Sequence, residues 1–275
     1  MNKEIKDVGK GVMRITTLDE RFYALPKKSK LTGLPEYAFF PSSTWIAGYY
    51  PKGIAFYKWL AQKGWDEAES IKVSAGDRGS RVHYACEQID IGKGINIEED
   101  TYPSSQSEEL KTLEPQEIEA VVSYRDFIEE VKPELLCNEM TIFGDDYAGT
   151  LDKILRIKGQ IWIVDLKTSK YIWEEHKLQI ASYSHAKIAY QELEIKEEEW
   201  KNRKLAILQV GYKLNKKHWK FTEIEDKYEM FRVAYKIWDN ENPEAKPKQI
   251  EYPLVIESAF RKEEVKKIRA KKVIK

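Results

Sequence analysis

The sequence predicts an α/β protein in which helices flank a central sheet. Residues 146–157 end in aliphatic side chains, and residues 160–166 are a short run of β-branched and aromatic side chains, so both are expected to be strands. The dipeptide Lys158-Gly159 between them predicts a tight turn, which makes the two strands neighbours. Residues 115–131 have the apolar periodicity of an amphipathic helix, and residues 172–193 are expected to form a second long helix.

The remaining elements are expected from local composition. Before residue 133 we expect a hairpin at residues 13–23 around Leu18-Asp19-Glu20, helices at residues 53–64 and 66–90, and a polar loop or lid at residues 95–109. After residue 133 we expect the first core strand at residues 135–143, a strand pair at residues 205–212 and 219–224, and a last helix at residues 228–238. Aromatic residues recur at helical spacing in this last helix, so we assign them to the core rather than to base stacking.

The composition predicts one soluble domain. A chain of 275 residues with 42% hydrophobic side chains can bury a sizeable core. We expect a hairpin and helical region at residues 1–133, the core at 134–225, and a C-terminal helix with a basic tail at 226–275. No apolar run is long enough to span a membrane, and the N-terminus does not resemble a signal peptide, which predicts a cytoplasmic protein.

Cysteine content and charge narrow the class of protein. Cys86 and Cys137 are the only cysteines, which excludes a four-cysteine iron–sulfur cluster and a disulfide framework. The net charge is zero, but residues 201–220 carry seven basic and no acidic side chains, whereas residues 95–120 carry eight acids and one lysine. Such basic runs are usually solvated faces. This one, which includes Lys204, is also a candidate groove for a nucleic-acid backbone.

Two aspartates and a lysine form the most informative pattern. Across the expected hairpin, Asp152 and Asp165 lie opposite one another, so their carboxylates can share one cation. Asp165 and Lys167 are two residues apart and point to the same face of their strand. Two carboxylates can hold Mg²⁺ and leave room for a phosphate oxygen and a water, which the lysine can orient. The alternative is an exposed ion pair at a strand end, but Asp165 follows a segment that is expected to be buried.

These residues resemble the motifs of the PD-(D/E)XK nuclease superfamily, and within it the RecB-like branch. Asp152 matches the first aspartate, although Leu151 replaces the proline. The segment Asp165-Leu166-Lys167 matches the (D/E)-x-K element and is followed by Thr168-Ser169, as in many RecB-like members. The signature Q-x-x-x-Y is matched by Gln179 and Tyr183.

The resemblance carries several implications. It implies a restriction-endonuclease-like core, with a mixed central sheet flanked by helices and an N-terminal helical elaboration. It implies that the main-chain carbonyl of Leu166 is a metal ligand. It also implies that Gln179 and Tyr183 support the site or contact nucleic acid without taking part in the chemistry.

A second block precedes this core. The run from Arg78 to His83 (Arg-Gly-Ser-Arg-Val-His) resembles the R-G-x-x-V-H segment of RecB-like and mitochondrial-genome-maintenance-type exonucleases, where the histidine binds metal. On a helix, Glu87 lies one turn after His83 and faces the same way. Alone, such a histidine is more often packed or exposed. Together with the aspartate pair, we interpret it as a ligand whose second nitrogen is held by an acceptor.

Two further candidates have equally ordinary explanations. Ser42, Ser43 and Thr44 precede an expected helix, so they form either a seat for a phosphate or an ordinary N-cap. Glu139 lies on the first core strand and is either a further carboxylate near the metal or a paired strand residue. For Glu139 we favour the second interpretation.

Together the patterns predict a metal-dependent deoxyribonuclease. Water activated at one or two Mg²⁺ or Mn²⁺ ions would hydrolyse DNA, and the imidazole of His83 suits Mn²⁺. By resemblance to phage and mitochondrial exonucleases we favour an exonuclease on single-stranded ends, with recombination, repair or replication proteins as partners in a bacterial or phage-infected cell. The alternatives are a structure-selective or restriction-like endonuclease, a binding-only nucleic-acid subunit, and an enzyme acting on another phosphoester.

Overall fold

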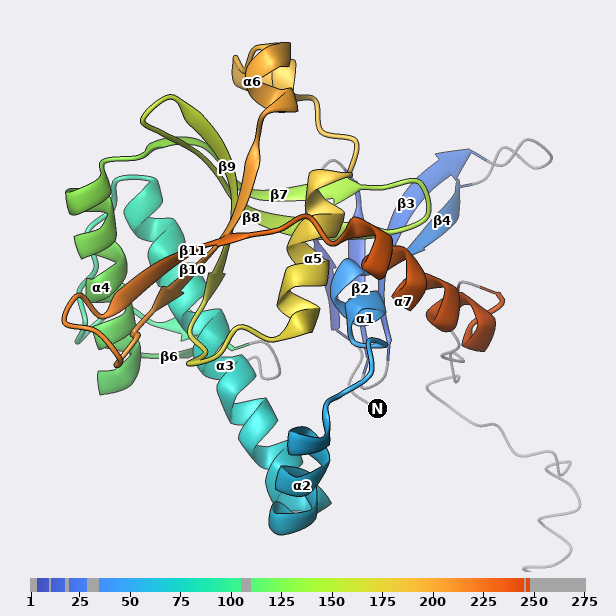
Figure 1. Ribbon diagram of the computed structural model, residues 1–275, viewed down its shortest axis with the longest axis horizontal. Coiled ribbons are helices and arrows are strands. Elements are labelled where there is room, and N and C mark those ends of the chain that lie inside the picture. The colour runs from blue at the N-terminus through green and yellow to red at the C-terminus, as the bar shows by residue number, and fades with distance from the viewer. Residues whose placement is uncertain are drawn as a thin grey trace, which may run out of the picture.

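In a computed structural model, the chain forms a mixed α/β fold around a five-stranded sheet (Figure 1). The structure describes residues 4–9, 11–17, 20–28, 35–104, 110–244 and 246–247. The strand order is β11-β10-β9-β8-β7, and only β9 and β10 run parallel. The bounds are Glu134–Phe143 for β7, Ala148–Ile157 for β8, Gln160–Lys167 for β9, Lys204–Val210 for β10 and Trp219–Ile224 for β11. The sheet is therefore mixed, as expected.

The turn between β8 and β9 has the predicted length. Ile157 pairs with Gln160, which leaves Lys158 and Gly159 as a two-residue loop. Both loop residues have positive φ, at 49° and 81°. Such a turn matches the twist of antiparallel strands and fixes their register.

Helices cover both faces of the sheet. Helices α3 (Trp65–Asp90) and α4 (Pro115–Val131) pack on one face, where Leu155 and Val164 contact them. Helix α5 (Glu174–Ser184) packs on the other face, against Ile154 and Ile163. Neighbouring residues of a strand thus enter different cores, as the period of two requires.

The N-terminal region departs from the expected helical elaboration. It contains a four-stranded antiparallel sheet, with β1 at Glu4–Asp7, β2 at Met13–Thr16, β3 at Arg21–Lys28 and β4 at Pro35–Pro41. The expected hairpin is confirmed as β2 and β3, although Leu18 and Asp19 of its turn lie outside the described residues. The other two strands escaped prediction because β1 is short and mostly charged and β4 begins and ends in proline.

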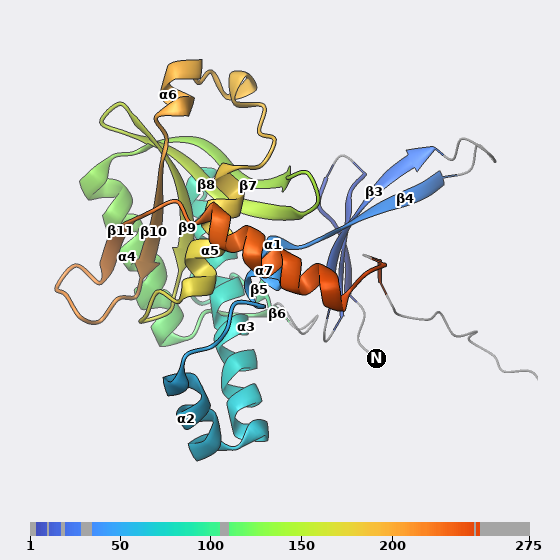
Figure 2. The same cartoon turned by 45° about the vertical axis from the view of Figure 1, so that its right-hand side comes forward.

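Three helices follow or pack beside this sheet. Helix α1 (Ser43–Ala47) and helix α2 (Ile54–Lys63) lead into α3, and α2 with the first half of α3 projects from the body (Figures 1 and 2). Helix α7 (Tyr228–Glu241) packs against α1 and α5. Its Phe231 and Trp238 are fully buried, which confirms that its aromatic stripe belongs to the core.

The helix expected at residues 172–193 is shorter than predicted. Helix α5 ends at Ser184, because the N–H of Lys187 donates to the carbonyl of Phe143 on β7 (2.8 Å) instead of continuing the helix. The 3-10 helix η1 (Tyr190–Leu193) and helix α6 (Glu197–Lys201) follow. The polar loop contains part of a two-stranded ribbon, β5 (Tyr102–Pro103) and β6 (Leu110–Lys111), while residues 105–109 and the basic tail lie outside the described residues.

Candidate metal centre

The site begins where two strands of the sheet separate. The pairing of β8 with β9 runs from the turn to the pair formed by Lys153 and Val164. The next residue is Asp152 on β8 and Asp165 on β9. The two aspartates therefore lie opposite one another, as the turn predicts. The carboxylate of Asp152 accepts a hydrogen bond from the main-chain N–H of Leu166 (2.7 Å), so this side chain replaces a main-chain acceptor at the end of the ladder.

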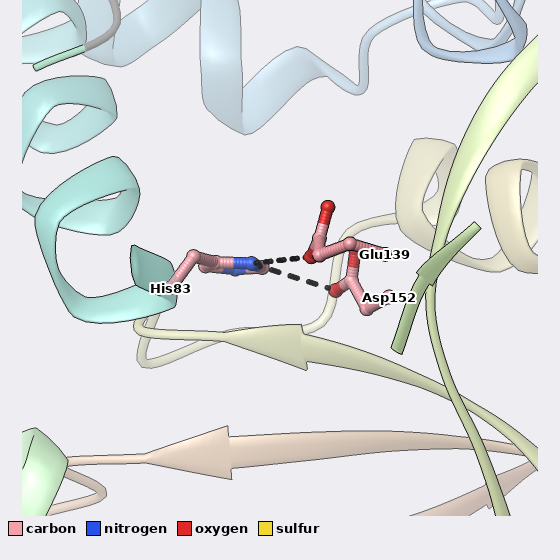
Figure 3. A group of neighbouring side chains, drawn as sticks. All are labelled: His83, Glu139 and Asp152. Carbon is pink, nitrogen blue, oxygen red and sulfur yellow. Dashed lines mark ion pairs between the residues drawn. The ribbon is translucent and has the colours of Figure 1, made fainter. Parts of the chain in front are cut away.

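Three side chains from distant parts of the chain converge beside this point (Figure 3). They are His83 of α3, Glu139 of β7 and Asp152 of β8, and one donor atom of each lies within 4.8 Å of the others. The His83 Nδ1 atom is 3.7 Å from Asp152 Oδ2 and 4.0 Å from Glu139 Oε1. One imidazole and two carboxylates at this spacing form a group that could hold a divalent cation.

The orientation of His83 is set by the backbone of β9. Its Nε2 atom lies 2.9 Å from the carbonyl oxygen of Leu166. Because a carbonyl can only accept, Nε2 carries the proton, and in the neutral ring Nδ1 offers its lone pair to the carboxylate side. The resemblance implied that the Leu166 carbonyl is a ligand. In the structure this oxygen accepts the imidazole N–H, in the manner of acceptors behind metal-binding histidines.

The charges around His83 favour its protonated form when no cation is present. Burial lowers the pKa of His83, but the carboxylates of Asp152 and Glu139 outweigh burial and raise it overall. A divalent cation would occupy the place of that proton among the same carboxylates. The donor set thus fits a cation electrostatically as well as geometrically.

Glu139 joins this group, so our preference for an ordinary paired strand residue was wrong. The residues on either side of it pair with β8, and its register position is opposite Asp152. Its φ angle is 49°, in the left-handed region that non-glycine residues adopt rarely inside a strand. Such a conformation is an energetic cost that the surrounding structure must offset, and residues of this kind gather at functional sites.

Asp165 and Lys167 lie behind the three donors. Asp165 is fully buried, and one of its oxygens is 2.5 Å from the Lys167 ammonium. Apart from this ammonium, neither carboxylate oxygen has a partner among the described residues. Burial raises the pKa of Asp165 to about 6, although Lys167 opposes this. A fully buried carboxylate that is paired only with a lysine and lies near three metal-type donors fits a centre that takes a cation.

Gln179 and Tyr183 support the site from α5. The side-chain amide of Gln179 donates to the hydroxyl of Tyr183 (2.5 Å), so the two motif residues are in direct contact. Burial raises the pKa of Tyr183 well above its ordinary value, so the phenol stays neutral. Its ring packs so closely over Gly149 that a Cβ atom there would lie 2.8 Å from it.

The three hydroxyl residues at the start of α1 make different contacts. Ser42 caps α1, since its oxygen accepts the N–H of Trp45 (3.1 Å), and Ser43 donates to the carbonyl of Ala148 (3.1 Å). Both side chains are buried, and Ser42 is the ordinary N-cap that was the alternative to a phosphate seat. Of the three, only Thr44 lines the cleft, which is the cavity that contains His83, Glu139 and Asp152.

The remaining candidates are divided between the cleft and the surface. Glu87 lines the same cavity as His83, and burial raises its pKa to about 7. Arg78, Thr168 and Ser169 line a neighbouring cavity. Lys204 lies at the start of β10, whereas Gln209 near the end of that strand pairs with Lys167. Lys204 forms an ion pair with Glu223 and lines neither of these two cavities.

The structure adds basic residues that the sequence patterns did not indicate. Lys6, Arg14 and Arg21 of the N-terminal sheet line the cavity of about 570 Å³ that contains the metal-type donors. This sheet is anchored beside the site, since Lys6 donates to the hydroxyl of Tyr84 (2.7 Å) and the hydroxyls of Tyr23 and Thr150 are hydrogen-bonded (2.9 Å). No local signal could reveal them, because the sheet reaches the site only through tertiary packing.

Two comparisons, with protein families and with curated proteins, found no match. No protein-family model matches the chain, and no curated protein matches it significantly. In the described part of the chain, no helix is both long and apolar enough to cross a bilayer.

Proposed function

We propose that the protein is a metal-dependent nuclease that hydrolyses phosphodiester bonds of DNA, as an exonuclease acting on single-stranded ends. The observation that carries the proposal is the convergence of His83, Glu139 and Asp152 beside the buried ion pair of Asp165 and Lys167. A module that only binds nucleic acid has no need of such a group. The cofactor of this nuclease is Mg²⁺ or Mn²⁺.

The donor set supports this choice of metal. Two carboxylates suit the hard Mg²⁺ ion, and the imidazole of His83 suits Mn²⁺ better than Mg²⁺. The residues that would hold the ion are His83, Glu139 and Asp152, with Asp165 directly behind them. A bound ion would supply Lewis-acid stabilisation of the phosphate and lower the pKa of a water.

The protein's own groups supply the remaining tasks. Burial lowers the pKa of Lys167, but Asp165 and Asp152 outweigh burial and raise it overall, so the side chain remains an ammonium. In the cleft it is able to orient a water and to offset negative charge that develops on the phosphate. Gln179 and Tyr183 hold the wall of the site through their mutual hydrogen bond.

The substrate class follows from the charges of the cleft. The basic residues Lys6, Arg14 and Arg21 line the same cavity as the carboxylates, and they would bind the phosphates of a strand that reaches the metal centre. Single strands and free ends are favoured by the resemblance of the motifs to RecB-like exonucleases. Recombination, repair and replication proteins are the corresponding partners.

The test is digestion of single-stranded DNA labelled at its 5′ or its 3′ end, with Mg²⁺, by the wild type and by Lys167→Ala. We expect the variant to lose at least about a hundredfold in rate, which is typical of removing one transition-state donor. Lys201→Ala is the matched control, because this exposed lysine on α6 pairs with Glu197 away from the cleft. Equal rates for Lys167→Ala and the wild type would refute the assigned site.

A restriction-like or structure-selective endonuclease is the second candidate. It is favoured by one observation, namely that cavities lie on both sides of Lys167. Circular single-stranded DNA distinguishes the two, since an exonuclease leaves circles intact and an endonuclease opens them.

A further inference from the structure

The cleft does not end at the metal centre. A second cavity of about 670 Å³ lies between α3, α4 and the segments that follow β9 and β10. It shares Gly76, Gly79, His83, Lys167 and His176 with the first cavity. The two cavities therefore adjoin at the metal centre, one on each side of it.

The second cavity has the chemistry of an anion site. Its lining includes the cations Arg78, Lys170 and Lys213, and Glu117 is its only carboxylate. Glu117 is neutralised by Arg81, which donates to both of its oxygens. The first cavity, in contrast, contains the acidic residues of the metal centre.

The three cations are not committed to strong internal pairs. The side chain of Arg78 has no hydrogen bond or ion pair with another described residue, and the ammonium of Lys170 lies over the ring of Tyr171. Lys213 is 3.3 Å from Glu119, but both side chains are more than half exposed, and such pairs contribute little. Their charge is available to a ligand.

The wall that carries these cations is held in place. The buried side chain of Gln209 donates to the carbonyls of Ser169 and Lys170 (2.8 and 3.0 Å), which fixes the segment after β9. The N–H of Gly211 donates to the hydroxyl of Ser123 on α4 (2.9 Å), which fixes the segment after β10. A preorganised wall loses little entropy when a ligand binds.

We propose that the DNA strand crosses the metal centre and that its phosphates beyond the scissile bond bind Arg78, Lys170 and Lys213, so that the enzyme releases oligonucleotides rather than mononucleotides. This inference rests on the proposed nuclease function. Hydrolysis adds one water across one P–O bond, which leaves a hydroxyl on one fragment and a phosphate on the other. A mononucleotide released from an end that carries no terminal phosphate has at most the scissile phosphate, which lies at the metal centre. On such an end, cations beyond that point have a partner only when the released fragment is longer than one nucleotide.

The size of the second cavity agrees with this proposal. At about 670 Å³ it lies within the range of roughly 300–1,000 Å³ that holds small organic ligands. It has room for nucleotide units on the product side, which a site that ends at the scissile phosphate would lack.

The first test measures the length of the initial products. The wild type and the double variant Arg78→Ala/Lys213→Ala digest a single strand with hydroxyl groups at both ends in the presence of Mg²⁺, and products of the first cleavage are separated at low conversion. We expect the wild type to release fragments of two or more nucleotides, and the double variant to cut more slowly with a raised KM. Lys216→Ala is the control, because this exposed lysine lies in the same turn but lines neither cavity. Mononucleotides as the only first product of the wild type would overturn the inference.

The second test measures binding without cleavage. A labelled single strand is titrated in Ca²⁺ at several salt concentrations, with thermal unfolding used to show that each variant is folded. Loss of two phosphate contacts is expected to reduce the slope of log K against log salt by about 1.4, while Lys216→Ala retains the slope of the wild type. An unchanged slope in the double variant would overturn the inference and leave the nuclease proposal standing. A wild type that binds DNA and never cuts it would refute the nuclease proposal itself.

Discussion

Asp152 accepts the main-chain N–H of Leu166, and the main-chain carbonyl of Leu166 accepts the imidazole N–H of His83. One peptide segment of β9 thus orients two of the three donors that converge in the cleft. Because these contacts use main-chain atoms, they do not depend on the side chain at position 166. The third donor, Glu139, is oriented by its own backbone conformation.

Replacement of Glu139 by glutamine is expected to weaken Mn²⁺ binding by about tenfold or more, since a neutral amide oxygen replaces a charged ligand. Isothermal titration of the apo-protein with Mn²⁺ measures this. Glu134→Gln on the same strand is the control, because Glu134 pairs with Arg156 at the exposed end of β7. Equal affinity in both variants would remove Glu139 from the centre.

Loss of the buried ion pair between α3 and α4 is expected to destabilise the fold. The guanidinium of Arg81 lies 2.6 Å from Glu117, and both side chains are almost fully buried. In Glu117→Gln the Arg81 charge is left uncompensated, which costs about 3 kcal/mol in the free energy of unfolding. Urea denaturation measures this value. The exposed Glu119→Gln should stay within about 0.5 kcal/mol of the wild type, and a similar change in both variants would contradict the prediction.

Gly149→Ala tests the close contact between β8 and α5. The new Cβ atom would meet Tyr183 Cε1 at 2.8 Å and Ser43 Oγ at 3.1 Å, so the ring must move. We expect a loss of about 1–3 kcal/mol in stability, together with slower cleavage because Tyr183 lines the cleft. Gly94→Ala is the control, since nothing lies within 4 Å of its Cβ position. If the Gly149 variant is as stable as the control, the packing is looser than described.

His176 is expected to make the fold sensitive to acid. Burial, assisted by Lys167 and Lys52, lowers its pKa to about 3 from an ordinary value of 6.5. Between these values the unfolded chain binds a proton that the folded chain does not bind, so this contribution to stability is lost as the pH falls. The melting temperature of His176→Gln should therefore drop less than that of the wild type between about pH 7 and about pH 5.

The control for this measurement is His218→Gln, which replaces an exposed histidine in the segment between β10 and β11. It should retain the full acid sensitivity of the wild type. An equal drop in all three proteins would show that His176 does not contribute. Chelator is included throughout, so that metal binding does not change with pH during the experiment.

The sequence was most informative where short-range chemistry determines the structure. The turn at Lys158-Gly159 and the period of two are local, and they were sufficient to place Asp152 opposite Asp165. The bounds of α4 were also predictable, because Pro115 is at its first turn and Glu114 and Glu117 form a capping box.

The sequence was least informative where distant segments compete or meet. Helix α5 ends early because β7 takes the N–H of Lys187, and no local pattern indicates that partner. Strand alternation does not reveal the positive φ of Glu139, so the sequence left open whether this carboxylate lies beside the other donors or is an ordinary strand residue. The basic residues Lys6, Arg14 and Arg21 reach the cleft only because a separate sheet docks against β7, β8 and α3.

The register of the β8–β9 hairpin restricts how this protein can evolve. Asp152 and Asp165 face one another because equal numbers of residues separate each from the turn. A single inserted or deleted residue on one strand would break that symmetry and carry one aspartate to the opposite surface of the sheet. Length changes that occur on both strands together, two residues at a time, preserve the arrangement. Distant homologues should therefore differ in hairpin length only by such matched steps.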